Sequence, residues 1–303
     1  MSHFYRRIFF WFLVAIFIVA TLFISLYAAG YQVNLSWPLK PKELLQKTGA
    51  LFVDTKPRGA TIILIDKNRQ TLLGQKIVKQ NKTKTPAKIY RLLPGEYEVR
   101  FELDGYWPFV KEIWINPNEA TYLENIELFL KGAPLKIRST SLQSLHLSAD
   151  GRQLLLDQDQ AVLDLNNNDA TSSLSYAEAL KTLGSSFTPL KNPSVKLSAN
   201  FSNNNQIIYA TDFEIYYLDI KNNNRLLLTR YSQAINGLIW ASKNYLIFST
   251  AKEINALDLK QGEITNLLTM NKIGQPILNS AGDTLYFTAQ SGGESGLYKL
   301  NLK

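Results

Sequence analysis

The longest uninterrupted apolar stretch of the chain lies near its N-terminus and limits how the chain can fold. It runs from Ile8 to Ala29, 22 residues without a charged side chain. As a helix such a stretch is about 33 Å long, enough for a bilayer hydrocarbon core of about 30 Å. A single segment in lipid must satisfy its backbone polar groups internally, and only a helix does so. The stretch therefore predicts one transmembrane helix, with residues 1–30 forming a short tail and the anchor.

The charges on either side of this stretch bear on its orientation. Arg6 and Arg7 directly precede it and favour a cytoplasmic N-terminus. Three lysines on the other side reduce the asymmetry: Lys40, Lys42 and Lys47. We expect a single-pass protein of the cytoplasmic membrane whose C-terminal body lies outside the cytoplasm.

A cleaved signal peptide is the alternative for the same stretch. The small residues Ala28, Ala29 and Gly30 would suit a cleavage site. However, the apolar region of a signal peptide typically has about 7–15 residues, and this one is longer. We favour an uncleaved anchor, and in either case the body is exported.

Composition limits the size and chemistry of that body. The chain has 303 residues, so about two domains are expected. It has two histidines and no cysteine, and the absence of cysteine excludes disulfides and thiolate metal sites. The net charge of +8 is uneven: +4 over residues 1–47, +3 over 48–133 and +1 over 134–303. Positive charge beside the anchor points to an anionic surface near the membrane.

After a linker at 31–48, residues 49–130 have the pattern of short strands. Tyr97, Val99, Phe101 and Leu103 alternate with charged residues, as in a half-buried strand. Turn signals recur about every ten residues, which is typical of a small β-sandwich. Gly59, Gly95 and Gly105 are expected in turns with positive φ.

The segment from Gly49 to Phe129 resembles a PEGA domain. The resemblance rests on the pattern GxLxVxTxPxGAxI from Gly49 to Ile62, on Thr85-Pro86, on the LPGEYEV run and on Gly105-Tyr106. The signature tetrapeptide has the form PRGA here, and Asp66-Lys67-Asn68 replaces the usual Asp-Gly turn. The resemblance implies a surface domain behind a membrane anchor and carries no catalytic residues.

Aromatic side chains of this segment are divided between core and surface. We expect a core position for Tyr97, Phe101, Tyr106 and Trp114. Two further aromatics follow a turn and are candidates for an exposed contact with a sugar or a protein: Trp107 and Phe109.

A run of basic residues is the other candidate contact. Between residues 67 and 95 the chain has eight basic residues and no acid, and a long polar hairpin is expected there. Its cations are Lys67, Arg69, Lys76, Lys79, Lys82, Lys84, Lys88 and Arg91. They would attract anionic lipid headgroups or wall polymers. The alternative is a solvated hairpin whose lysines prevent edge pairing. Nucleic acid is not expected as a partner, because only Tyr90 interrupts the run.

Residues 134–303 contain four similar segments. Their apolar centres are Leu154–Leu156, Ile207–Tyr209, Leu246–Phe248 and Leu285–Phe287, spaced by 53, 39 and 39 residues. A four-stranded unit at this period matches a propeller blade. The Ser-Ala-Asp-Gly-Arg and Leu-Asp-Leu phrases resemble TolB-like propeller repeats. The fold class predicted is therefore all-β: a PEGA-like sandwich and then a short β-propeller of about four blades, either complete or incomplete.

The last repeat ends before its fourth strand. The segment PLKIRST, residues 134–140, precedes the first repeat and has strand character. We predict that it supplies the missing strand and closes the ring. The insertion in the first interval is expected to contain a short helix over Tyr176–Leu183.

Catalytic and metal-binding patterns are weak, so no cofactor, metal or catalytic residue is expected. His146 alternates with leucines in a strand, and Asp157 and Asp159 lie at a turn. The Asn-rich runs 166–169, 203–205 and 222–224 lack calcium-loop spacing. We expect a non-enzymatic envelope binding or scaffold protein with a protein or glycan ligand. The alternative is a glycan-directed enzyme with carboxylates on the propeller face.

Overall fold

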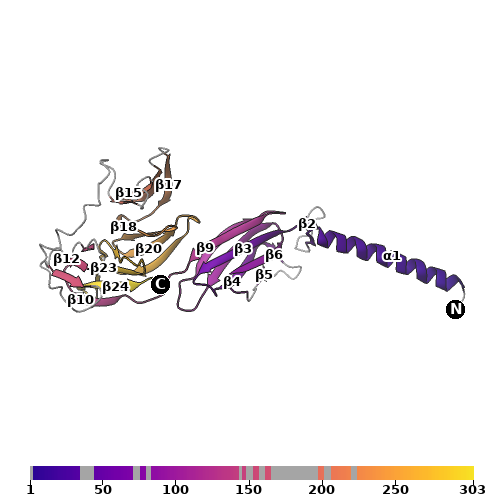
Figure 1. The fold of residues 1–303 in the computed structure, drawn as a ribbon, viewed down its shortest axis with the longest axis horizontal. Helices are drawn as coiled ribbons and strands as arrows, with labels where there is room; N and C mark the ends of the chain where they lie inside the picture. Colours follow the sequence, from indigo (N-terminus) through magenta and orange to yellow (C-terminus); the bar gives the residue numbers. More distant parts are fainter. Residues whose placement is uncertain are drawn as a thin grey trace. The chain divides into compact units, whose positions relative to one another are not determined.

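In a computed structural model of the protein, the structure describes residues 3–34, 44–70, 76–79, 83–142, 145–147, 153–156, 161–164, 197–200, 206–219 and 224–303. The chain divides into two compact units, Met1–Leu128 and Phe129–Lys303. The fold is mostly β, with one apolar helix at the N-terminus (Figure 1). Each unit is described by itself below.

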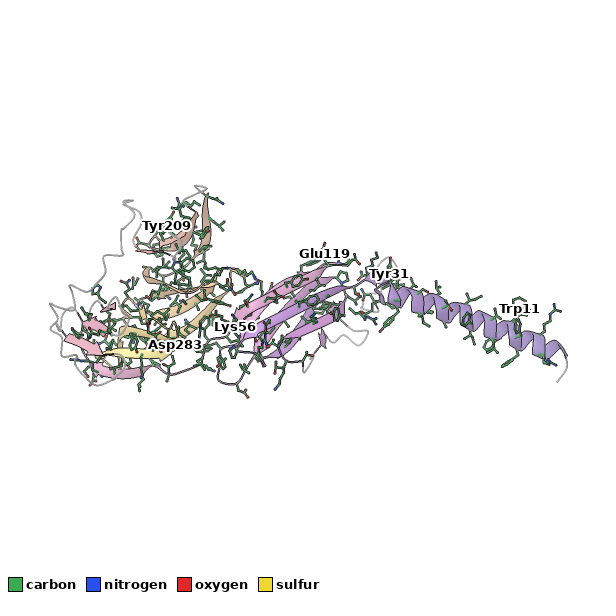
Figure 2. The ribbon with its side chains drawn as sticks, viewed as in Figure 1. Trp11, Tyr31, Lys56, Glu119, Tyr209 and Asp283 are labelled. Carbon is green, nitrogen blue, oxygen red and sulfur yellow. The ribbon has the colours of Figure 1, made fainter. Side chains whose placement is uncertain are left out.

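The helix α1 spans His3–Ala28. Within it Phe9–Ala28 is long and apolar enough to cross a membrane, and none of that window is buried inside the protein. Its large apolar side chains are exposed around the helix, with Trp11 at 62% and Phe17 at 71% exposure (Figure 2). A soluble domain rarely leaves such a surface open, and lipid is the solvent that accepts it. The expected candidate span is confirmed.

The region expected as a linker has a short strand near each end, and these two strands pair to form a small hairpin. Strands β1 (Tyr31–Val33) and β2 (Leu45–Lys47) pair in antiparallel register. Gly30, with φ of 82°, turns the chain out of the helix. Its carbonyl accepts hydrogen bonds from the Thr48 amide and from Thr48 Oγ1, each at 2.9 Å. The end of α1 is thereby fixed to the chain that enters the next strand.

Two sheets face one another in the rest of this unit. One has the order β5-β4-β7-β8 and the other the order β6-β3-β9, with β3 and β9 parallel. Their bounds are β3 Gly49–Lys56, β4 Thr61–Gln70, β5 Lys76–Lys79, β6 Ala87–Leu92, β7 Gly95–Glu102, β8 Phe109–Ile115 and β9 Ala120–Glu127. Buried side chains from both sheets form one core, including Leu51, Ile62, Val99, Phe101 and Leu123. The predicted β-sandwich is confirmed.

The turn glycines and most core aromatics follow the prediction. Gly59, Gly95 and Gly105 have positive φ. Tyr97 and Phe101 are buried, and Tyr106 packs against the core.

The prediction for Trp114 is wrong, because its side chain is 58% exposed on the outer side of β8. Alternate positions of that strand, Phe109, Ile113 and Ile115, are buried instead. The two faces of a strand exchange with a shift of one residue.

The second unit contains four small antiparallel sheets. Their orders are β11-β12-β13, β14-β15-β16-β17, β18-β19-β20-β21 and β10-β24-β23-β22. The bounds of the first three sheets are β11 Leu145–Leu147, β12 Gln153–Leu156, β13 Ala161–Asp164, β14 Leu197–Asn200, β15 Gln206–Ala210, β16 Glu214–Asp219, β17 Asn224–Arg230, β18 Ile235–Ser242, β19 Tyr245–Thr250, β20 Glu253–Asp258 and β21 Ile264–Thr269. The fourth sheet comprises β10 Leu135–Ser139, β22 Ile277–Leu278, β23 Thr284–Ser291 and β24 Glu294–Asn301. Each predicted apolar centre lies in the second strand of its repeat, as expected for four blade-like repeats.

The last sheet is completed from the start of the unit. Strand β10 pairs antiparallel with β24, from Leu135 opposite Lys299 to Ser139 opposite Gly296. The prediction that residues 134–140 supply the missing strand is confirmed. Ring closure stays a prediction, because residues 165–196 lie outside the described part of the chain. The helix expected over Tyr176–Leu183 falls in the same range.

Neighbouring sheets of this unit share apolar cores. One core joins Leu154 and Leu163 of the first sheet to Tyr286 and Leu297 of the fourth. Another joins Ile208 and Ile215 to Leu246 and Phe248, which are in the second and third sheets. Face-to-face packing of this kind lets small sheets bury their apolar sides.

Candidate binding surfaces of the first unit

The outer side of the sheet β6-β3-β9 carries a cluster of aromatic side chains, which we call the aromatic face: the half-buried Phe52 and the exposed Tyr90 and Tyr122. Phe52 lies between the other two, on the central strand. Its ring stacks on that of Tyr122 with centroids 5.1 Å apart and an interplanar angle of 15°. Tyr90 meets Phe52 edge to face at 5.9 Å. The exposure of Tyr90 is 59% and that of Tyr122 is 58%, so this apolar surface is open to a ligand.

Strand register explains why these rings gather. Phe52 is opposite Tyr122 in the parallel pair β3–β9 and opposite Lys88 in the antiparallel pair β3–β6. Leu51 and Val53, on either side of Phe52, point into the core, so Phe52 points outward. The Lys88 ammonium lies 5.4 Å from the centre of the Phe52 ring, within cation–π range.

A bulge in β6 adds a second cation to this edge. Gly49 is opposite Leu92 and Leu51 is opposite Ile89, so β6 has one residue more than β3 between these pairs. Ile89 and Leu92 are buried, whereas Tyr90 and Arg91 between them are both exposed. Arg91 takes a φ of 61°, an unfavourable value for a residue with a Cβ. Bulges of this kind re-aim side chains.

Arg91 lies against the end of the helix. Its guanidinium carbon is 3.4 Å from the centre of the Tyr27 ring. Two hollows adjoin this pair within the unit. One, of about 600 Å³, borders the aromatic face and is lined partly by Gly49, Phe52 and Glu119. We call it the sheet-end groove.

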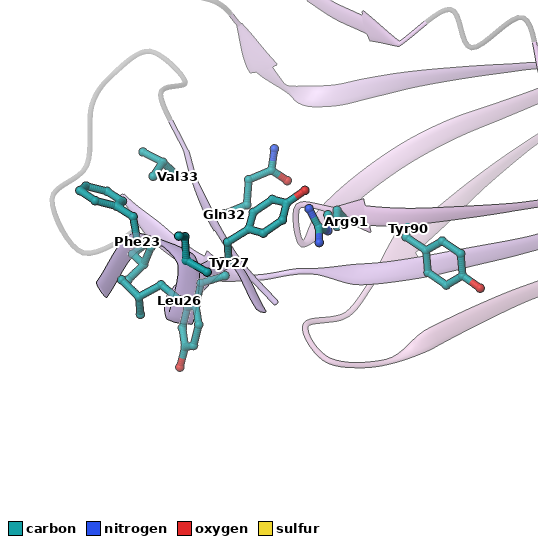
Figure 3. Close-up of a pocket in the computed structure, with 10 residues that line it drawn as sticks. Phe23, Leu26, Tyr27, Gln32, Val33, Tyr90 and Arg91 are labelled. Carbon is teal, nitrogen blue, oxygen red and sulfur yellow. The ribbon is translucent and has the colours of Figure 1, made fainter. Parts of the chain in front are cut away.

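The other hollow, of about 680 Å³, borders the last turns of α1, and we call it the helix-end pocket (Figure 3). Its lining side chains are Phe23, Ile24, Leu26, Tyr27, Tyr31, Gln32, Val33, Leu45, Tyr90 and Arg91.

The opposite sheet presents a different outer surface. Lys67 on β4 forms ion pairs with Glu112 and, at 3.4 Å, with Glu96. The hydrogen bond to Glu112 raises the pKa of Lys67, and the same bond lowers the pKa of Glu112. Arg100 pairs with Glu98 at 3.3 Å. Exposed pairs like these contribute little to stability, but they neutralise the surface.

The predicted basic run is therefore divided between two sheets. Lys67, Arg69, Lys76 and Lys79 belong to β4 and β5, whereas Lys88 and Arg91 belong to β6. Lys84 is exposed just before β6, and Lys82 lies outside the described residues. The hairpin β4–β5 exists, but it does not gather all eight cations on one surface. Lys67 is engaged by two carboxylates and is not available as a free cation.

One of the two predicted aromatic contacts is wrong. Phe109 is only 4% exposed, because it is the first inward position of β8 and packs on Phe101. Trp107 is half-buried. The aromatic face, which the sequence reasoning missed, was signalled by the outward position of Phe52 between two core residues.

The second unit has a polar cluster between its second and third sheets. The Tyr231 hydroxyl donates to Glu253, and Asn255 Nδ2 donates to Tyr231 Oη at 3.3 Å. Burial, together with the bond to Glu253, raises the pKa of Tyr231 to about 12. The cluster links Tyr231, which precedes β18, to two side chains of β20, and its hydrogen bonds are structural.

Among the residues that the structure describes, no three His, Asp or Glu side chains gather closely enough to hold a metal ion. His146 is exposed on β11. Asp157, Asp159 and the runs 166–169, 203–205 and 222–223 lie outside the described residues.

Comparison with known families identifies the first unit. Residues 48–128 match the PEGA domain model, which confirms the resemblance drawn from the turn motifs. The chain thus carries a PEGA domain directly after its apolar helix. No curated protein matches the chain.

Several solved structures are similar to the chain to a limited degree. TolB from Acinetobacter baumannii shares 11% identity at a TM-score of 0.33, covering 68% of this chain and 46% of that one. The N-terminal domain of Nup159 shares 17% at a TM-score of 0.26, covering 57% and 49%. The computationally designed Ika4 protein shares 12% at a TM-score of 0.30, covering 55% and 98%. The chain spans less than half of the length of the TolB and Nup159 chains.

Proposed function

We propose that the protein is a non-enzymatic binding protein of the cell envelope, whose ligand is a wall glycan that carries anionic groups. The observation that carries the proposal is the aromatic face, where the half-buried Phe52 ring contacts the exposed rings of Tyr90 and Tyr122. The cations Lys88 and Arg91 are on the neighbouring strand β6. Flat aromatic surfaces with polar neighbours suit the apolar faces of sugar rings. The sheet-end groove continues this surface toward the helix.

The proposal also includes a topology. The helix α1 anchors the chain in the cytoplasmic membrane, with Arg6 and Arg7 on the cytoplasmic side. The PEGA domain is then held within reach of the wall. Protease added to intact spheroplasts should degrade the body. A body that remains intact until the membrane is lysed would contradict this orientation.

Binding to the wall is tested with the full chain in detergent and purified, insoluble wall polymer. Replacing Phe52 and Tyr122 together by alanine should weaken co-sedimentation at least tenfold, because each ring contact contributes about 1 kcal/mol. The matched control is Trp114→Ala, which removes an equally exposed ring from the opposite sheet. Equal losses in the two variants would contradict the assignment of the aromatic face.

If the ligand is a protein and not a glycan, the wild-type chain will fail to co-sediment with the polymer in the same experiment. That result would refute the glycan ligand. Release of soluble sugar fragments by the purified chain would refute the non-enzymatic part of the proposal.

A further inference from the structure

The helix-end pocket adjoins the aromatic face at Tyr90 but differs from it in chemistry. Its walls are mainly apolar and come from three places in the unit: the last turns of α1, the β1–β2 hairpin and the bulge of β6 (Figure 3). Val33 and Leu45, on the hairpin, are 48% and 43% exposed although both are aliphatic. The hairpin thus leaves apolar surface open beside a helix that is itself apolar.

Among the residues that the structure describes, Arg91 is the cation that lines the pocket, and none of the described lining residues is acidic. A second cation lies nearby, since the Lys47 ammonium is 5.7 Å from the centre of the Tyr31 ring. The site therefore combines a mainly apolar wall with Arg91 in its lining and Lys47 against the lining residue Tyr31.

The geometry of Arg91 leaves it able to bind an anion. The guanidinium rests on the face of the Tyr27 ring, and a guanidinium that stacks by its face keeps its N–H groups in plane at its edge. Those N–H groups match the oxygens of a phosphate in a bidentate manner. The positive φ of Arg91 shows that the bulge holds this side chain here despite an unfavourable backbone.

The depth of the pocket follows from the span. The apolar window ends at Ala28, and the pocket is lined by helix residues from Phe23 to Tyr27. Tyrosines such as Tyr27 and Tyr31 are typical of the boundary between hydrocarbon and headgroups. An apolar wall below and a cation above, at this boundary, match the two ends of a lipid molecule.

We propose that the helix-end pocket binds one phospholipid of the extracytoplasmic leaflet. The acyl chain lies along Ile24, Val33 and Leu45, and the phosphate lies at Arg91. The bound lipid fills the hollow between the anchor and the PEGA domain, so that the domain stands in a fixed relation to the membrane surface. This inference rests on the membrane anchoring in the proposed function, but not on the glycan ligand.

Native mass spectrometry of the full chain in detergent tests the site, with phosphatidylglycerol as the added probe. After delipidation, the wild-type chain should take up one phosphatidylglycerol. Arg91→Gly removes the cation and relieves the positive φ, so the variant should fold while its lipid occupancy falls at least tenfold. Replacing Val33 and Leu45 together by serine should lower occupancy to a similar extent. Lys84→Ala, which removes an exposed cation outside the pocket, should bind like wild type.

Two results would overturn the inference. One is unchanged phosphatidylglycerol binding by Arg91→Gly. The other is displacement of the lipid by millimolar inorganic phosphate, which would reduce the site to a general anion site.

Failure of the proposed function is recognised separately. A chain recovered from cells without detergent would refute the anchor. Lipid binding that persists in a Phe52→Ala, Tyr122→Ala variant without wall binding would place the two ligands at different surfaces.

Discussion

Gly49, at the start of β3, offers the sharpest test of how the PEGA domain is assembled. A Cβ added there would lie 2.4 Å from the Asn116 carbonyl oxygen and 2.7 Å from Ile115 Cγ2. The Glu119 carbonyl oxygen would be 3.1 Å away, and that oxygen accepts the Ala50 amide at 2.9 Å. Two of the three obstacles are backbone atoms, so the turn between β8 and β9 must move to admit even one methyl group.

The magnitude follows from opposing effects. Overpacking against backbone costs about 3 kcal/mol, at the upper end of the usual range. The loss of glycine freedom in the unfolded chain returns about 0.5–1 kcal/mol. The net destabilisation of Gly49→Ala is then about 2 kcal/mol, or about 30-fold in the opening equilibrium of the domain. For a domain of this size it corresponds to a fall in Tm of about 8–16 °C.

Hydrogen exchange of the full chain in detergent, followed by mass spectrometry, localises the effect. Peptides from β3 and β9 should exchange about 30-fold faster in Gly49→Ala. Two other glycines serve as graded controls, because a Cβ at Gly59 or Gly132 would meet nothing within 4 Å. Gly59→Ala should cost about 1 kcal/mol from its positive φ, and Gly132→Ala should leave β3 unchanged. Protection in β3 that is equal in Gly49→Ala and wild type would refute the close approach.

Three further predictions concern other parts of the chain. Tyr231 should ionise near pH 12. Its raised pKa gives stability that is complete below pH 10 and is lost as the pH rises through 12. In ultraviolet difference spectra at 295 nm, the tyrosine ionisation step near pH 12 should be absent from Tyr231→Phe. Glu112 has a lowered pKa beside Lys67, so its contribution is present above its ordinary pKa of 4.5 and lost at more acidic pH; a Glu112→Gln variant that kept the acid-induced change in Tm would contradict the pairing. Ile18→Lys places a charge in the middle of the candidate span at a cost of about 2.5–3.5 kcal/mol, and alkaline extraction should release more of this variant from membranes than of Ile18→Leu.

The sequence was most informative where a local period or length was sufficient. The alternation of Tyr97, Val99 and Phe101 with charged residues predicted a half-buried strand, and all three side chains are buried on β7. The faces of β8 were predicted wrongly for Phe109 and Trp114. Apolar residues occupy both of its faces, so alternation alone could not say which of them points into the core.

The candidate site was mostly hidden from sequence reasoning. The position of Phe52 between Leu51 and Val53 could have indicated one outward ring. Its contacts with Tyr122 and Tyr90 depend on strands 70 and 38 residues further along the chain and on their register. The bulge that exposes Arg91 has no signal in its own residue type, since arginine rarely adopts a positive φ.

The apolar stretch, the PEGA turns and the four repeats were determined by the sequence alone. Each depends on residues close together in the chain, through helix length, turn conformation or strand period. The tertiary structure decided the aromatic face, the division of the basic run between two sheets and the bulge that exposes Arg91. These depend on which distant strands become neighbours, and that choice is made by the burial of whole sheet faces and not by any one segment.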